Sequence, residues 1–451
     1  MSFLGIEIAR RSLLGHQRAL TTTAHNIANI NTPGYSRQEA VLQTTLAISY
    51  PSVFSPRPGQ LGTGMHVTEI RRFRDAYLDR QVREANSAIG YWSGMETALQ
   101  RVEAVLPEPT DFGIQALLGD FFSAWHYLAQ DPDNPGSKAV VKGAAETLAN
   151  SLSLAHYSIT NIREDLDGLF DKHLERINSL GQQISELNWE IAYQRNAGAN
   201  PNDLLDRRDY LLEELAKLAD TTVTVPADLA HLQVVSVEVY GVELVDGTQY
   251  DETGFGFLTL ERQDAEDAVK VDDETFKTRG ELAATAAAAA KVEGYLEHLG
   301  RLMDDLAGAV NGVLGEGGVP ATFFVYDDVA GQLSLDSDEA DAVLAAITAE
   351  QAWAVAQLRE QKVADGGEAT LEGFYQRLVT GIGADLNTAQ RGLDNVNAIL
   401  GQIEALRESV SGVNLDEELT RMIQYQYGYQ AAARVITVLD EMLDTLINRM
   451  L

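Results

Sequence analysis

Apolar residues alternate at spacings of three and four at both ends of the chain, and this pattern limits the possible folds more than any other feature. Spacings of this kind form a narrow stripe along a helix, as in coiled coils. We therefore expect two amphipathic helices that pair with each other. We call the following twelve stripe residues the predicted assembly seam: Phe3, Ile6, Leu13, Leu20, Ile27, Leu415, Leu419, Met422, Tyr429, Ile436, Leu443 and Ile447.

Breaking and capping residues delimit both terminal helices. The first helix ends in the run from Asn29 to Gly34, which contains a proline that cannot continue a helix. Asn414 or Ser411 can cap the last helix, whose first turn is acidic. Residues 1–34 carry a net charge of +2 and residues 413–451 a net charge of −3, which favours pairing of the two ends. The pattern leaves open whether this pair is a simple intramolecular hairpin or also takes partners from other copies.

The middle of the chain is predominantly helical in pattern, with one β-rich stretch. Valines alternate through 223–262 between glycine turns, which predicts strands. A short hairpin is expected where Phe323–Tyr326 and Gln332–Leu335 flank a turn. Helices are expected over the ranges 75–106, 114–129, 137–218 with an interruption at Asn200 and Pro201, 280 onward, and 371–410.

These elements predict a mainly α protein, with a terminal α-helical coiled coil, an elongated helical bundle and a small inserted β domain. Residues 1–70 with 400–451 would form the coiled-coil assembly domain. Residues 71–220 with 280–399 would form the helical core, which contains the hairpin. Residues 221–279 would form a β-rich outer insertion.

Composition excludes several classes of function. The 451 residues carry a net charge of −33, so phosphate backbones and anionic membranes would repel the chain, and neither nucleic acid nor membrane is expected as a partner. No 18-residue apolar run is present, and the apolar start meets arginines too early for a cleavable signal. With no cysteine, disulfides, thiol catalysis and Cys-ligated zinc are ruled out. We predict no catalytic residues, no cofactor and no metal.

Three local patterns are candidates for a site. Asp131 and Asp133 superficially fit a calcium loop, but Pro135 and Lys142 occupy ligand positions, so a helix-connecting turn is expected. The arginines between 71 and 83 are predicted to form a solvated or intersubunit helix face. His16 and His25 lie in the first helix, where protonation could perturb assembly near pH 6.

Two long motifs at opposite ends resemble those of the bacterial flagellar axial proteins, and within that family the hook-associated branch at the hook–filament junction. The first motif contains Asn29, Asn31, Thr32, Pro33, Gly34, Tyr35, Ser36 and Arg37. The second begins near Asn414 and includes Arg434 in the run Tyr-Gln-Ala-Ala-Ala-Arg-Val-Ile. The resemblance covers residues 1–220 and 370–451 and is weak between them.

The resemblance implies a structural role rather than an enzymatic one. The protein would leave a cytoplasmic pool by flagellar type III export and polymerise at the hook tip as a ring of identical copies in the extracellular flagellum. Its implied partners are other copies of itself, the hook protein, a second hook–filament junction protein and an export chaperone. Two alternatives are another axial protein, such as a hook or flagellin-like subunit, and an axial scaffold whose β insertion binds a surface.

Overall fold

The computed structural model describes residues 2–47, 62–251, 254–272, 275–315 and 322–448. Within these residues the protein is mainly α-helical with short antiparallel strands, which confirms the predicted fold class. None of the helices in the described ranges is long and apolar enough to cross a bilayer.

The chain forms two compact units, each built from separate stretches of sequence. Unit 1 contains Met1–Asn86, Ile177–Leu260 and Asn397–Leu451, and unit 2 contains Ser87–Arg176 and Glu261–Val396. Both ends of the chain therefore belong to unit 1. The stretch 221–279 divides between the units after Leu260.

Unit 1 combines the terminal helices with a hairpin, a short helix and a sheet. Its complete elements are α1 (Ser2–Ala28), β1 (Gln38–Thr44), β2 (Met65–Arg72), α5 (Asn202–Leu218), β3 (Thr221–Thr224), the 3-10 helix η1 (Ala227–Leu232), β4 (Ser236–Val239), β5 (Val242–Asp251), β6 (Gly254–Phe257) and α11 (Leu415–Asn448). It also contains parts of α2 (Ala76–Val105), α4 (Pro135–Asn196) and α10 (Leu371–Ser411).

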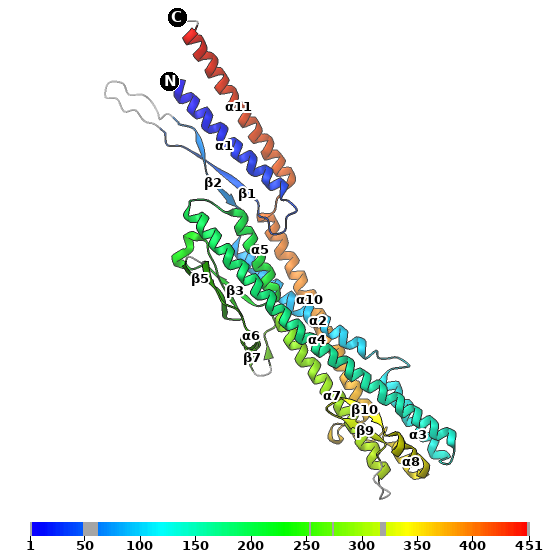
Figure 1. Ribbon diagram of the computed structural model, residues 1–451. Helices are drawn as coiled ribbons and strands as arrows, with labels where there is room; N and C mark the ends of the chain where they lie inside the picture. Colours follow the sequence, from blue (N-terminus) through cyan, green and yellow to red (C-terminus); the bar gives the residue numbers. More distant parts are fainter. Residues whose placement is uncertain (1, 48–61, 252–253, 273–274, 316–321, 449–451) are drawn as a thin grey trace. The chain divides into compact units, whose positions relative to one another are not determined.

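The two terminal helices lie side by side and run antiparallel, so the two ends of the chain lie at the same end of the pair (Figure 1). Their pairing confirms what the matching stripes and opposite charges predict. α1 stops at Ala28, ahead of the predicted breakers. Asn414 caps α11, because its Oδ1 accepts hydrogen bonds from the backbone N–H groups of Asp416 and Glu417 at 3.0 and 3.2 Å.

Strands β1 and β2 form an antiparallel hairpin that the sequence analysis did not predict. The β-rich stretch is an antiparallel sheet in the order β3-β4-β5-β6. One face of this sheet packs on α4, where Ala192, Leu232, Val234 and Phe255 form a buried cluster. The valine alternation thus follows from a sheet that is covered on one side.

Unit 2 is a helical bundle with two small hairpins. Its complete elements are α3 (Ile114–Gln130), α6 (Arg262–Val269), β7 (Lys270–Asp272), β8 (Thr275–Phe276), α7 (Glu281–Gly315), β9 (Phe324–Asp327), β10 (Gln332–Leu335), α8 (Ser337–Ala346), α9 (Ala349–Gln357) and the 3-10 helix η2 (Asp365–Gly367). Strands β9 and β10 confirm the predicted short hairpin.

The core of unit 2 contains a cluster of aromatic side chains and a region where small side chains let two helices pack closely. Phe121, Trp125 and Phe323 are completely buried, with ring centroids 6.2 Å apart for the first pair and 5.4 Å for the second. The alanine run of α7 allows close helix packing: a Cβ at Gly94 of α2 would lie 2.9 Å from the Ala284 Cβ. The Asp131–Asp133 segment is a helix-connecting turn, and the Asn134 side chain caps α4 through the Gly136 N–H at 2.8 Å.

Candidate assembly site

Asn26, in the last turn of α1, is the centre of a hydrogen-bonded hub. Its Nδ2 donates to the Gln38 carbonyl at 2.8 Å and to Glu418 Oε2 at 2.9 Å. Its Oδ1 accepts from the Tyr35 hydroxyl at 2.8 Å and from the Gln38 N–H at 3.0 Å. These four bonds use the full capacity of an amide side chain. We call Asn26, Tyr35, Gln38 and Glu418 the hub; it joins α1, the motif turn, β1 and α11.

Burial keeps the Tyr35 hydroxyl of the hub protonated and makes its hydrogen bonds costly to break. Burial, together with the nearby charges of Asp203, Asp206 and Glu418, raises the pKa of Tyr35, so its hydroxyl keeps the proton that it donates to Asn26. Asn26 and Glu418 are each only 1% exposed. An unpaired polar atom would be costly here, so the hub tolerates few alternative arrangements.

The motif turn before the hub needs its glycine. Gly34 has φ of +77°, and a Cβ at this position would lie 2.9 Å from the Tyr210 Cβ. Within the turn, the Thr32 hydroxyl donates to Asn29 Oδ1 at 3.1 Å. Asn31, Thr32 and Pro33 are exposed. The motif therefore combines a close-packed position that only glycine fits with an exposed tip.

Arg37 and Ser36 connect the motif to three further elements. The Arg37 N–H donates to the Ser411 carbonyl at the end of α10 (2.9 Å), and its guanidinium lies 4.5 Å from the Phe73 ring centroid. Its Nη1 also pairs with Glu417 at 3.3 Å. The Ser36 N–H donates to Asp206 Oδ2 of α5 at 3.0 Å. One short segment thus fixes the relative positions of α5, the end of α10 and the start of α11.

The arginine stretch is not a solvated or intersubunit helix face, so that prediction is wrong for its central members. Arg72 lies at the end of β2 and Arg74 in the following loop, and both point into unit 1. Arg72 Nη1 pairs with Asp206 at 2.9 Å and with Asp209 at 2.7 Å. Arg74 pairs with Asp79 at 2.7 Å and with Glu213 at 3.1 Å. We call these six residues the arginine cluster.

Asp206 and Asp209 of the cluster have opposite pKa shifts. Burial raises the pKa of Asp206, and the nearby Arg72 offsets only part of this effect. Burial would also raise the pKa of Asp209, but the charges of Arg74, Arg72 and Arg208 outweigh it and lower that pKa. The acidic helix α5 therefore neutralises arginines that are more than 130 positions earlier in the sequence.

The predicted seam residues on α1 do not form the centre of the contact with α11. Ile6, Leu13, Leu20 and Ile27 are each half-buried. The side chains of Phe3 and Ile447 lie outside the described residues. The contacts that the structure does show involve Gly5, which is covered by Leu439, and His16, whose ring lies 2.5 Å from the position of a Cβ at Gly428.

Small and polar residues therefore form the contacting face of α1. Continuing from Gly5 at spacings of four and three gives this face: Gly5, Ala9, Ser12, His16, Ala19, Thr23 and Asn26. Ala9, Ala19, Thr23 and Asn26 are buried. Gly5, Ser12, Ala19 and Asn26 are each one residue before a seam residue, namely Ile6, Leu13, Leu20 and Ile27. The recurrence of glycine, alanine, serine and threonine at helical spacing is the signal that could have identified it.

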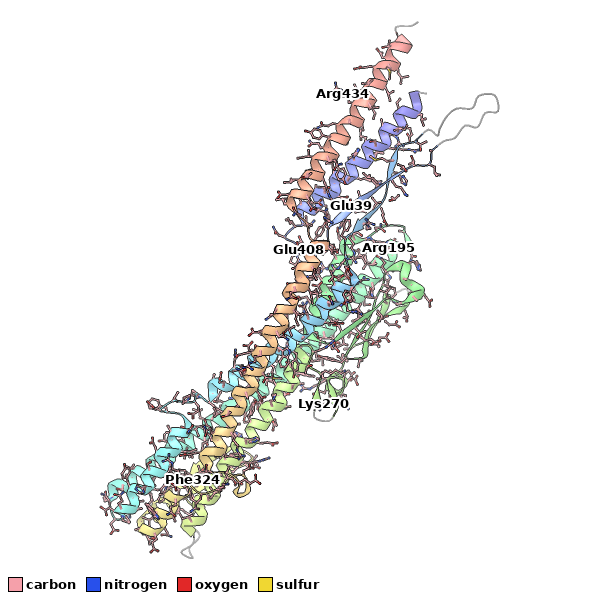
Figure 2. The ribbon with its side chains drawn as sticks, turned by 180° about the vertical axis from the view of Figure 1, so that it is seen from behind. Glu39, Arg195, Lys270, Phe324, Glu408 and Arg434 are labelled. Atoms are coloured by element: carbon pink, nitrogen blue, oxygen red, sulfur yellow. The ribbon has the colours of Figure 1, made fainter. Side chains whose placement is uncertain are left out.

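The α11 side of the predicted seam splits between two faces. Met422, Tyr429, Ile436 and Leu443 are half-buried and share a face with the buried Glu418 and Ala432. Leu415 and Leu419 are 44% and 41% exposed. Further apolar side chains are also exposed along this helix, namely Ile423, Tyr427, Val435, Val438 and Met442. Arg434 lies on the side of α11 that faces away from α1, and Glu408 marks the end of α10 (Figure 2).

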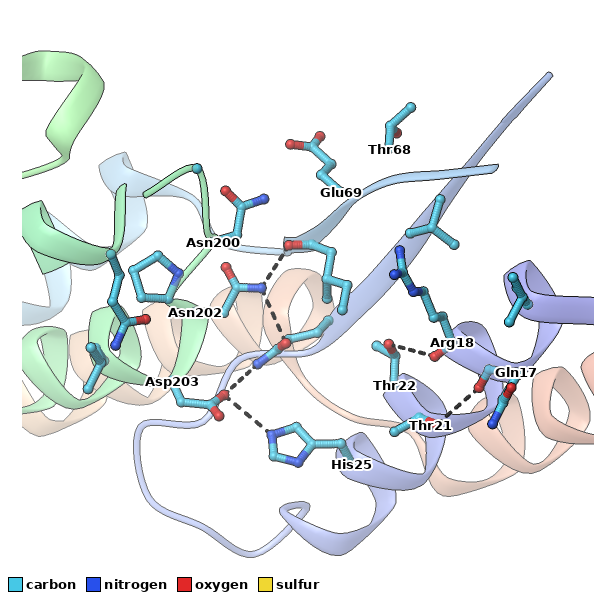
Figure 3. Close-up of a pocket in the computed structure, with 18 residues that line it drawn as sticks. Gln17, Arg18, Thr21, Thr22, His25, Thr68, Glu69, Asn200, Asn202 and Asp203 are labelled. Carbon is cyan, nitrogen blue, oxygen red and sulfur yellow. Dashed lines mark hydrogen bonds and ion pairs between the residues drawn. The ribbon is translucent and has the colours of Figure 1, made fainter. Parts of the chain in front are cut away.

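A polar groove of about 950 Å³ lies beside the hub, between α1, β2 and the turn from α4 to α5 (Figure 3). At its base, Asp203 accepts from Gln38 Nε2 at 2.8 Å and lies 3.3 Å from His25 Nε2. The Asn202 side chain donates to the Ile70 carbonyl at 2.8 Å. These bonds attach the hairpin to α5. Over the parts of the chain that the structure describes, no group of three His, Asp or Glu residues could hold a metal ion.

Comparison with known proteins finds similarity to flagellar hook-associated proteins. Residues 99–319 match the model of the flagellar hook-associated protein FlgK helical domain. The chain is 29% identical to flagellar hook-associated protein 1 of Bacillus subtilis (strain 168), over 100% of this chain and 98% of that protein. The chain is thus similar to flagellar hook-associated protein 1 along its full length. This confirms the resemblance to the hook-associated branch of the axial proteins.

Further hook-associated proteins match over most of the chain. Flagellar hook-associated protein 1 of Salmonella typhimurium (strain LT2) is 23% identical, with 98% of this chain and 99% of that protein covered. The hook junction protein FlgK from Burkholderia pseudomallei has the same fold: its TM-score is 0.61 at 14% identity, over 73% of this chain and 100% of that structure.

The two ends match models of rod proteins as well. Residues 6–35 match the flagella basal body rod protein model, and residues 407–450 match the C-terminal model of the rod FlgEFG proteins. In this structure the hub brings these two segments together. The two matched segments include most of α1 and α11 and three of the four hub residues, Asn26, Tyr35 and Glu418.

Proposed function

We propose that the protein assembles at the tip of the flagellar hook and forms the junction from which the filament grows. The observation that carries this proposal is the match to flagellar hook-associated protein 1 over the full chain. The structure adds a physical reason for assembly, because α11 leaves apolar side chains in water along its outer side.

Assembly would be driven by burial of these side chains between copies. Fully burying a leucine or valine contributes about 1.5–3 kcal/mol. Neighbouring copies in a ring would cover Leu415, Leu419 and Ile423 on α11 and the half-buried stripe Ile6, Leu13, Leu20 and Ile27 on α1. The predicted assembly seam then has two roles. One side of the seam faces α1 of the same chain and contains Met422, Tyr429, Ile436 and Leu443. The other seam residues would face neighbouring copies.

The partners and the route follow from the same proposal. Hook protein would lie below the ring and the second junction protein above it, with a dedicated chaperone holding the C-terminal region before export. The type III route carries unfolded chains, and a cysteine-free chain suits it because no disulfide can block unfolding. The role is structural, in keeping with a family of structural flagellar proteins.

A rod, hook or flagellin-like subunit is the second candidate, and the two rod-type matches at the ends favour it. The match of residues 99–319 to the hook-associated helical domain favours the junction. Antibody labelling on isolated flagella separates the two: label at a single point between hook and filament fits a junction protein, and label along the rod, hook or filament fits another subunit.

Complementation of a deletion strain tests the junction role. Without the gene, electron microscopy should show hooks without filaments, and the wild-type gene should restore them. Leu419→Asp places a charge on the outer face of α11, and Ile436→Asp places one on the face towards α1. Each should abolish filaments because a buried unpaired charge is costly. Val329→Asp is the control, since Val329 is 99% exposed at the tip of the β9–β10 hairpin.

Immunoblots of the culture medium would separate export from assembly. The assembly-defective variants should be exported and released as monomers. Filaments in the deletion strain, or normal filaments with Leu419→Asp, would contradict the proposal.

A further inference from the structure

The face of α1 that contacts α11 is not the more apolar of two neighbouring faces. The contacting face carries Gly5, Ser12 and Ala19, and the adjacent predicted stripe carries Ile6, Leu13 and Leu20. The two faces are one residue apart, which is a rotation of about 100° around the helix axis. Apolar burial alone would favour turning the larger side chains inward. Other interactions must therefore hold α1 in the observed rotation. One is apolar packing, since Met65 and Leu42 of the β1–β2 hairpin cover Gly15 on another face of α1, and a polar one lies on the contacting face itself.

The buried Asn26–Glu418 pair provides that interaction. Asn26 Nδ2 lies 2.9 Å from Glu418 Oε2, and both side chains are almost completely buried. The second oxygen, Oε1, accepts no hydrogen bond from the residues that the structure describes and lies 3.8 Å from Arg421 Nη1. Glu418 therefore has a single hydrogen-bond donor, and that donor belongs to α1.

Rotation of α1 by one residue would break this pair. Ile27 would then face Glu418, and a buried carboxylate would lose the one hydrogen bond it accepts. Asn26 would also lose its two bonds with the Gln38 backbone and the bond from Tyr35, which come from the motif turn and β1. The cost of four broken polar contacts opposes the gain from burying the larger stripe.

We propose that the Asn26–Glu418 pair is a rotational lock that selects the small-residue face of α1 for contact with α11. The lock acts much as a buried polar residue fixes the alignment of a coiled coil at a cost in stability. It is a property of the isolated chain. Its consequence, that Ile6, Leu13 and Leu20 stay outward for neighbouring copies, rests on the proposed junction function.

Disulfide trapping in the full-length chain tests the lock, because the sequence contains no cysteine of its own. The residue numbers of the three known contacts, Gly5–Leu439, His16–Gly428 and Asn26–Glu418, each add to 444. Ser12 therefore faces Ala432. Ser12→Cys with Ala432→Cys, the first pair, reports the observed rotation. Leu13→Cys with Ala432→Cys, the second pair, reports the rotated one, since cysteines whose Cβ atoms point apart do not bridge.

Each cysteine pair is placed in three backgrounds, oxidised with diamide and quantified by mass spectrometry. With Asn26 and Glu418 intact, the yield of disulfide from the first pair should exceed that from the second pair at least about tenfold. In Asn26→Leu/Glu418→Leu, where an apolar pair of similar size replaces the polar one, that ratio should fall about tenfold. Glu418→Gln, which can still accept from Asn26, should keep the original ratio.

A ratio that is unchanged in the doubly apolar variant would overturn the lock, and so would the absence of a preference in the intact chain. If the double variant does not fold, Glu418→Leu alone decides: it keeps the bonds of Asn26 to Tyr35 and Gln38, and its ratio must fall for the lock to stand. Filament assembly is scored separately in cells. Confirmed trapping with normal filaments in the apolar variant would refute the assembly consequence and leave the lock intact.

Discussion

Helices α3 and α11 differ in how far their apolar side chains are buried within the chain. α3 is 17 residues long, and seven of its residues are buried, including Phe121, Phe122 and Trp125. α11 is twice as long, and its buried side chains within the described part are Glu418 and Ala432. The apolar face of α3 is satisfied within its own unit, whereas α11 keeps apolar side chains in water. The difference supports the proposal that other copies complete the apolar surface of α11.

Truncation of one apolar side chain on each helix should give the largest contrast. Trp125→Ala removes a completely buried indole that packs between Phe121 and Phe323, and a substitution of this kind costs about 3–5 kcal/mol of unfolding free energy. Ile423→Ala, at a side chain that is 52% exposed, should change it by no more than about 0.5 kcal/mol. Chemical denaturation of the purified monomer measures both. A large loss with Ile423→Ala would show that α11 is already covered in the monomer.

Substitutions in the arginine cluster measure how much the buried ion pairs of unit 1 stabilise the protein, for comparison with the apolar core around α3. Asp209→Asn removes the carboxylate 2.7 Å from Arg72 and should cost about 3 kcal/mol, because largely buried arginines lose their counter-charge. Asp206→Asn is the matched control and should cost about 1 kcal/mol, since burial already disfavours its ionised form. Equal losses would show that the two carboxylates are equivalent.

The same aspartates should respond to acid with opposite signs. The pKa of Asp209 is lowered in the folded protein, so its contribution to stability is full above its ordinary pKa of about 4 and is lost as the pH falls through the lower folded value. The pKa of Asp206 is raised, so its ionised form lowers stability near neutral pH, and protonation relieves that cost. The slope of stability against pH below about pH 5 should therefore be smaller in Asp209→Asn than in the parent.

Mild acid should loosen α11 and leave α3 unchanged, and this is the smallest effect we expect. Burial lowers the pKa of His16, which packs on Gly428 and lies beside the Tyr425 ring. When α1 and α11 are apart, His16 is exposed and binds a proton as the pH falls below about 6.5. In the paired helices His16 binds that proton only at a lower pH, so pairing weakens between these two pKa values. Hydrogen exchange of α11 peptides at about pH 5.5 and about pH 7.5, on either side of that ordinary value, should show faster opening at the lower pH, after correction for intrinsic rates.

His16→Gln is the control for this pH effect, and it should remove the difference while the exchange of α3 peptides stays constant. If α11 opens equally at both pH values in the parent protein, His16 does not control the pairing.

Local signals in the sequence determined the helices and their ends. The breaker run from Asn29 to Gly34 follows directly on the end of the first helix, Asn414 caps the last, and valine alternation marks the sheet, because each depends on neighbours a few residues away. The pairing of the chain ends was also predictable from stripes and charge. By contrast, the β1–β2 hairpin escaped prediction, because its two strands are separated by a long connection with no short turn signal.

Only the tertiary structure decided which face of α1 touches α11 and where the arginines go. Periodicity identifies an apolar stripe, but the burial of Asn26 and Glu418 outweighs the preference for larger side chains, and those two residues are 392 positions apart. Arg72 and Arg74 read as an exposed helix face because their counter-charges on α5 are invisible to local spacing. Local sequence determines the secondary structure that each segment forms. Buried polar contacts between distant segments determine which face each segment packs inward.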